Sequence, residues 1–210
     1  MEGMGRFGIR IESALGVSIP ELRSLAKELG RDHRLALALW DTGLHEAMIL
    51  ATMVDDPAAV TEEQMGSWTG RFDSWDLCDQ CCSNLYWRTP YAWKKTLEWC
   101  ERDEEFVKRA GFTMMAVLAV HDKKAGHDDF LILLDRIERH SSDDRNFVRK
   151  AVNWALRQIG KRDLYLNARA IEAGERIMAK GDRSSRWVAT DALRELRSDT
   201  VQQRLKKRGA

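Results

Sequence analysis

Proline is scarce in this chain, which has only three in 210 residues. Proline interrupts helices, and disordered chains have few hydrophobic residues. A composition of 44% hydrophobic and 32% charged residues with so little proline is therefore typical of a helix-rich globular protein. No stretch alternates between polar and apolar residues over the length of a strand, so we expect no β-strands. The sequence predicts an all-α fold.

Long apolar runs are also lacking. Nowhere are 18 consecutive residues apolar, and the opening MEGMGRFGIR has no apolar core of the kind found in signal peptides. These two absences predict a cytoplasmic protein that makes no contact with membranes.

Cysteine is limited to four residues, three of them at Cys78, Cys81 and Cys82. Cys78 and Cys81 have C-x-x-C spacing, but no second pair or paired histidines follow at the spacing of a zinc site. His45-Glu46 does not begin an H-E-x-x-H motif, because position 49 is Ile. We expect reduced cysteines that pack in the core, no metal site and no cofactor.

Charge is distributed unevenly, although the net charge of the whole chain is only +1. Residues 141–210 contain 17 Lys and Arg and 9 Asp and Glu, a net charge of +8, and residues 1–140 have a net charge of −7. Such asymmetry indicates either a polyanionic partner such as nucleic acid or ordinary solvated helix faces.

Helical patterns follow one another along the chain after an irregular lead over residues 1–17. Ser18 with Glu21 three residues later predicts a capping box, with Pro20 in the first turn and Gly30 at the end. Further helices are expected at 34–40, 45–53, from 61, 74–85, 91–99, 104–120, 128–139, 144–159 (ended by Gly160), 164–180, 185–197 and 199–207.

A repeat of 41 residues runs through the second half. The repeated positions are Ala110, Ala151 and Ala192, and Phe106, Phe147 and Val188. A period near 40 is typical of HEAT and armadillo repeats, whose concave face is the usual binding surface. We expect residues 18–208 to form a curved solenoid, with residues 1–210 as one domain. The repeat phase also predicts that Lys108 and Arg109 align with Arg149 and Lys150 in one basic row.

An acidic and aromatic stretch, FDSWDLCD (72–79), stands out before the repeats. In a helix, Trp75 and Asp79 are four residues apart and share one face, which suits a cationic ligand. The alternative is that Trp75 is a core residue. Asp73 and Asp76 are expected to act as a helix cap and as a first-turn partner of the helix dipole. Trp187 is expected to pack beneath the last repeat.

Four motifs together carry a family resemblance: FDSWDLCD (72–79), FVKRAGF (106–112), RNFVRKAVNWALRQIGKR (145–162) and RWVATDALREL (186–196). Over about residues 17–205 the chain resembles the AlkD-like DNA alkylation repair proteins. The resemblance implies HEAT-like repeats, duplex DNA as partner, and a metal-free hydrolase of the DNA glycosylase type. Such an enzyme cleaves the N-glycosidic bond of cationic purines alkylated at N3 or N7.

The same resemblance implies roles for individual residues. Asp79 is the catalytic carboxylate, Trp75 and Trp154 are aromatic walls, and Arg109 contacts a DNA phosphate near the lesion. Phe147 takes a position near the DNA, although Asn146 departs from the paired aromatics of some members. Lys108, Arg149 and Lys150 complete the DNA-binding set from the basic row.

The N-terminus departs from the pattern of active members, because only 19 residues precede Pro20. The chain is more similar to shortened members that lack a helix that enters the minor groove. One alternative is therefore a catalytically weak or inactive paralogue that binds DNA or another partner through its basic concave face. Another is a scaffold that binds proteins. We expect a monomer.

Overall fold

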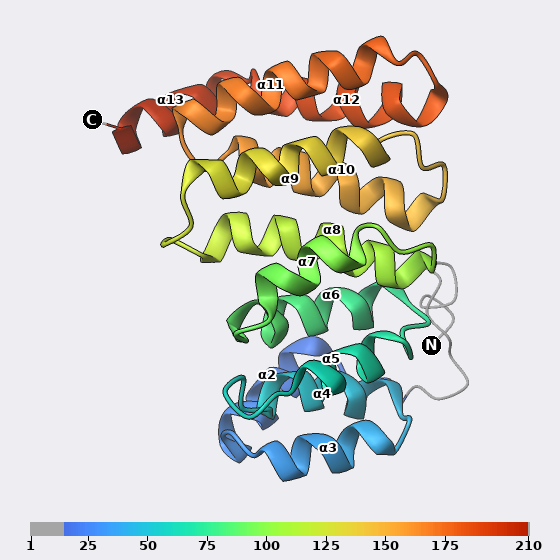
Figure 1. The fold of residues 1–210 in the computed structure, drawn as a ribbon. Helices are drawn as coiled ribbons and strands as arrows, with labels where there is room; N and C mark the ends of the chain where they lie inside the picture. The colour runs from blue at the N-terminus through green and yellow to red at the C-terminus, as the bar shows by residue number, and fades with distance from the viewer. Residues whose placement is uncertain (1–14, 210) are drawn as a thin grey trace. The chain divides into compact units, whose positions relative to one another are not determined.

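The computed structural model describes residues 15–209, so most of the irregular lead predicted for residues 1–17 lies outside the described residues. Within that range the chain forms twelve α-helices and one 3-10 helix, without a strand (Figure 1). The all-α prediction is confirmed. None of the described helices is long and apolar enough to cross a membrane.

The helix bounds lie close to those expected from the sequence. In order they are α2 (Ile19–Leu29), α3 (His33–Asp41), α4 (His45–Val54), α5 (Glu62–Thr69), α6 (Trp75–Asn84), η1 (Tyr86–Arg88), α7 (Ala92–Trp99), α8 (Glu105–His121), α9 (His127–His140), α10 (Asn146–Gly160), α11 (Leu164–Ala179), α12 (Arg183–Leu196) and α13 (Asp199–Gly209).

Local side-chain chemistry fixes several of these ends. The main-chain N–H and the hydroxyl of Ser18 both donate to Glu21 Oε2, at 2.8 and 2.7 Å, as the capping box predicts. Gly30 ends α2 with a φ of 71°, a conformation that favours glycine. Thr61 caps α5 by accepting a hydrogen bond from the main-chain N–H of Gln64 at 3.1 Å.

Contacts within the chain group it into two compact units, one ending at Lys94 and the other beginning at Lys95. In the first unit, α4 packs against α2, α3 and α6. Its core contains Trp40 and Trp68, whose rings stack at 4.0 Å. Cys78, Cys81 and Cys82 are buried, free thiols, as expected of cysteines that pack in the core.

The second unit is built from the predicted repeats. Helix α8 packs against α10, and α10 against α12, while α9 and α11 pack together beside them (Figure 1). The repeated alanines, Ala110, Ala151 and Ala192, are fully buried, one in each of α8, α10 and α12. The repeated aromatics Phe106 and Phe147 also meet, with ring centroids 5.5 Å apart. The single domain expected over residues 1–210 stays a prediction.

Gly160 has a role beyond the helix-ending one predicted. It is the last residue of α10, and its φ is not positive. A Cβ added there would lie 2.7 Å from Leu196 Cδ2 and 2.8 Å from Ala170 Cβ. α10 does end at Gly160 as predicted, but its C-cap is Lys161. Glycine is also needed here for the close approach of other helices, which a helix-end signal does not reveal.

Candidate functional site

Trp75 and Asp79 both line one pocket in the first unit. Trp75 is the first residue of α6 and Asp79 follows one turn later, and both side chains are half-buried. The pocket has a volume of about 450 Å³. Its lining comes from the start of α2, from α4 and from α6: Gly16, Val17, Ser18, Ile19, His45, Glu46, Ile49, Trp75, Asp76, Asp79 and Gln80.

Glu46 fixes the chain that leads into α2 along this pocket. Its carboxylate is 3% exposed and accepts hydrogen bonds from the main-chain N–H groups of Leu15, at 2.8 Å, and Gly16, at 2.7 Å. Burial opposes the charged form, but the hydrogen bonds outweigh it and lower the pKa of Glu46 below its usual value. Glu46 therefore adds a fixed negative charge to the lining.

His45 and Asp76 form an ion pair in the same lining. His45 Nε2 lies 2.8 Å from Asp76 Oδ2, and the side chains are 6% and 15% exposed. Burial disfavours both charges, yet the hydrogen bond and the opposite charge outweigh it. The pKa of His45 is raised above 6.5, and the pKa of Asp76 is lowered below 3.8. The pair ties α4 to the first turn of α6, next to Trp75.

The structure corrects part of what was expected of Asp73 and Asp76. The N-cap of α6 is Ser74, so Asp73 is not the cap. Asp76 lies in the first turn as expected, but it also binds His45. Glu46 and His45 had no site signal in the sequence, because their partners lie about 30 residues away along the chain.

The described lining of the pocket contains more acidic than basic side chains. Glu46, Asp76 and Asp79 carry carboxylates, and His45, which pairs with Asp76, is the one basic residue in that described lining. Trp75 adds an aromatic side chain to the same lining, and the face of an aromatic ring attracts cations. A planar cation would gain both contacts in a partly buried setting, where charges are screened less than in water.

The remaining predicted residues lie in the second unit. Trp154 is half-buried on α10, which also carries Phe147, Arg149 and the exposed Lys150. Arg109 is 6% exposed, and its Nη1 donates to the main-chain oxygen of Phe147 at 2.6 Å. Arg109 therefore binds the first turn of α10 to α8. That Trp154 meets Trp75 and Asp79 stays a prediction.

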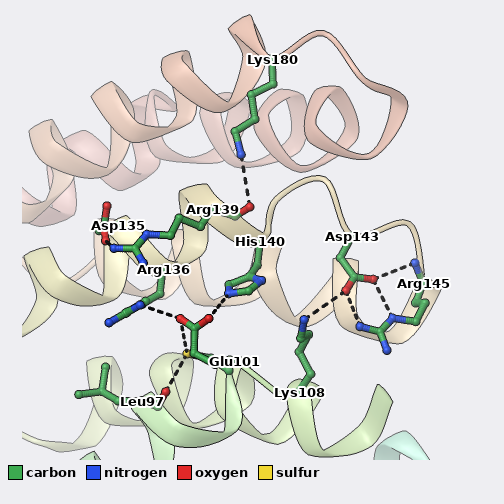
Figure 2. Close-up of polar contacts among 11 residues, drawn as sticks. Leu97, Glu101, Lys108, Asp135, Arg136, Arg139, His140, Asp143, Arg145 and Lys180 are labelled. Atoms are coloured by element: carbon green, nitrogen blue, oxygen red, sulfur yellow. Dashed lines mark hydrogen bonds and ion pairs between the residues drawn. The ribbon is translucent and has the colours of Figure 1, made fainter. Parts of the chain in front are cut away.

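Lys108, on α8, points toward Asp143 in the loop after α9 (Figure 2). Its ammonium is 3.9 Å from Asp143, which also pairs with Arg145 at 2.6 Å. Beside it, Glu101 accepts hydrogen bonds from Arg136 at 2.7 Å and from His140 at 3.1 Å.

The open basic row expected from the repeat phase is therefore incomplete. Lys108 and Arg109 are 6% exposed each, because α8 is covered by its neighbours over most of its length. Burial, together with the charge of Lys108, lowers the pKa of the adjacent His140. Arg149 and Lys150 are the members of the row that reach the surface.

No group of three or more His, Cys, Asp or Glu side chains that could hold a metal ion occurs within residues 15–209.

A solved structure described as "A new family of proteins related to the HEAT-like repeat DNA glycosylases with affinity for branched DNA structures" matches with a TM-score of 0.75. It is 19% identical, and the match covers 83% of this chain and 75% of that one. The fold is thus of the HEAT-like repeat class.

A family model described as "DNA alkylation repair enzyme" matches residues 1–196. The chain belongs to this DNA alkylation repair enzyme family. A comparison with curated protein sequences finds no match.

Proposed function

We propose that the protein hydrolyses the N-glycosidic bond of cationic purines alkylated at N3 or N7 in duplex DNA. Asp79 stabilises the positive charge of the transition state, and Trp75 flanks the cation. The observation that carries the proposal is the pocket that Trp75 and Asp79 share. Membership of the DNA alkylation repair family supports the class of substrate.

The chemistry suits these residue types. An alkylated purine cation is a good leaving group, so the C1′–N bond breaks without a strong general acid and its electron pair neutralises the base. Positive charge then builds on the sugar, where the Asp79 carboxylate stabilises it. Water adds to C1′ and loses a proton, which leaves an abasic site and a neutral alkylated base. A cation–π contact contributes about 0.5–2 kcal/mol.

His45 and Asp76 act as positioning residues in this scheme. Their 2.8 Å ion pair holds the first turn of α6, where Trp75 begins the helix. Because this first turn is held in place, the ring of Trp75 and the carboxylate of Asp79, one turn later, keep the same distance and orientation to each other. Preorganised charge is effective because it needs little rearrangement as the reaction proceeds.

The DNA backbone contacts belong to the second unit. Arg149 and Lys150 at the surface of α10 meet phosphates, and Phe147 lies near the DNA at the start of that helix. Contacts of Lys108 and Arg109 with phosphate stay a prediction. Through its bond to Phe147, Arg109 also supports the α10 end that approaches the DNA.

A second candidate function is DNA binding without base excision. It is favoured by the similarity to a structure described as having affinity for branched DNA. The net charge of +8 over residues 141–210 supports either function.

A single-turnover assay separates the two candidates. Duplex DNA with one 7-methylguanine is incubated with micromolar protein, and the released base is measured beside the dissociation constant. We expect release by the wild type, and a rate about 100-fold lower for Asp79→Asn, the usual cost of losing one stabilising charge contact. DNA affinity should change less than about threefold.

Asp73→Asn is the matched control, because Asp73 is an exposed acid just before the same helix. Its rate should stay within about twofold of the wild type, as is usual for exposed substitutions. Absence of base release, or equal rates for the Asn variants at positions 73 and 79, contradicts the proposed enzyme.

A further inference from the structure

Trp187 does not pack beneath the last repeat as the sequence suggested. It lies on α12 with 38% of its surface exposed. Three of the eight tryptophans behave differently: Trp40, Trp68 and Trp99 are at most 4% exposed. A large exposed aromatic side chain that the packing of the repeats does not require suggests a contact with a partner.

Trp187 lines a surface depression of about 440 Å³. The other lining residues are Arg186, Thr190, Asp191 and Arg194, all from the same face of α12. Trp187 is thus the one large apolar side chain in a polar lining. An apolar protein partner could bury little apolar surface here. A planar aromatic ligand with negative groups could instead contact both the ring of Trp187 and the arginines around it.

The positive charges around the ring are well placed for such a ligand. The guanidinium carbon of Arg149, on α10, lies over one face of the Trp187 ring, 4.8 Å from its centroid, so a ligand would stack on the other face. The side chain of Arg194 is 76% exposed, and its salt bridge at 2.5 Å is with Asp191. Arg186 is exposed next to the ring. Three arginines against one aspartate leave a net positive charge at the depression.

We propose that Trp187 is a stacking platform for an unpaired nucleobase of single-stranded DNA, with Arg186 and Arg194 at the flanking phosphates. Every base has a π face, and stacking on an aromatic side chain contributes strongly to single-strand binding. Within a paired duplex these faces are covered by neighbouring bases. The site therefore selects tails, gaps or frayed ends. This inference rests on DNA being the partner in the proposed function, but not on base excision.

The test compares two labelled DNAs by fluorescence anisotropy at one salt concentration. One is a blunt duplex, and the other is the same duplex with a single-stranded tail. We expect the wild-type protein to bind the tailed DNA more tightly. Trp187→Ala should weaken tailed-duplex binding about 10-fold, a typical loss for one stacked base, and leave blunt-duplex binding within about twofold.

Two further variants separate stacking from structural effects. Trp187→Phe keeps an aromatic face and should retain most of the preference for the tail. Tyr165→Ala is the matched control, because Tyr165 is also an exposed aromatic (46%) with an arginine, Arg169, 5.7 Å from its ring. It should bind both DNAs like the wild type. Thermal melting of each variant verifies that it is folded.

The inference is overturned if the wild type does not prefer the tail, or if Trp187→Ala weakens both DNAs equally. Tighter Trp187-dependent binding of an RNA tail overturns the assignment to DNA. If neither DNA is bound, the inference and the proposed function both fail. If base release is absent but the tail preference depends on Trp187, only the enzyme proposal fails.

Discussion

At the scale of single residues, the ion pair of His45 and Asp76 links the stability of the first unit to its pocket. Both side chains are mostly buried and both line the pocket that contains Trp75 and Asp79. Removing one partner leaves the other without its charge-assisted hydrogen bond in a poorly solvated place. The pair is therefore expected to contribute to folding as well as to the position of α6.

Asp76→Asn tests this contribution. We expect the free energy of unfolding to fall by about 1–3 kcal/mol near pH 6, the cost of losing a hydrogen bond to a charged group. Urea unfolding followed by circular dichroism measures it. Asp41→Asn, at an exposed acid at the end of α3, should change stability by less than about 0.5 kcal/mol.

The loss of stability caused by Asp76→Asn should depend on pH in a definite direction. The raised pKa of His45 gives stability that is fully present below about pH 6.5 and is lost as the pH rises through the folded-state value. The lowered pKa of Asp76 gives stability that is present above about pH 3.8 and is lost as the pH falls. The effect of Asp76→Asn should therefore be largest between about pH 4 and 6.5. A difference that grows at pH 9 contradicts the ion pair.

Proximity in the sequence decides which pocket residues could be predicted. Helical spacing placed Trp75 and Asp79 on one face, and both line one pocket. Glu46 and His45 were not predicted to line it, because each bonds to a partner about 30 residues away. A DNA contact of Arg109 stays a prediction, and its burial and its bond to Phe147 depend on the packing of α8 against α10.

At the scale of helices, the sequence predicted most boundaries because capping is local chemistry. Ser18 with Glu21, and Thr61, formed the contacts their types suggest. The short helix η1 (Tyr86–Arg88) was not predicted, since three residues carry no periodic pattern. The packing role of Gly160 was not predicted, because crowding by Leu196 and Ala170 comes from other helices.

Three helical glycines differ in how closely other atoms approach them, so replacing each one by alanine should change stability by a different amount. A Cβ at position 111 would lie 2.8 Å from Cys100 Cα, which is main chain and moves little. At position 160 it would meet side-chain atoms, and at position 66, in α5, it would meet nothing within 4 Å. Gly111→Ala should therefore destabilise most, and Gly160→Ala by about 1–3 kcal/mol.

Gly66→Ala serves as the control of that series. It should be neutral or stabilising by up to about 1 kcal/mol, because alanine favours the helix and restricts the unfolded chain. Denaturant unfolding of the three variants provides the ranking. A Gly160→Ala variant as stable as Gly66→Ala would contradict the close packing of α10 against α12.

For the molecule as a whole, the 41-residue repeat could be recognised from the sequence because each repeat has the same small residue at the same packed position. The repeat predicted the HEAT-like fold, and α8, α10 and α12 each bury its alanine. The charge asymmetry predicted a polyanionic partner but not which cations reach the surface. The packing of the repeats determines that Lys150 is exposed and that Lys108 is buried.

We propose that the pocket of Trp75 and Asp79 acts on a cationic base, and a comparison of a cationic with a neutral lesion tests this. Two duplexes of one sequence contain either 7-methylguanine, whose base is a cation, or O6-methylguanine, whose base is neutral. Base release is followed under single-turnover conditions, with and without protein, because the cation also leaves faster spontaneously. We predict that the protein accelerates release of 7-methylguanine at least about 100-fold over its spontaneous rate and leaves O6-methylguanine at its own, because a neutral base gains little from a carboxylate and an aromatic face. Equal accelerations for the two lesions, or no acceleration for 7-methylguanine, would contradict the proposal.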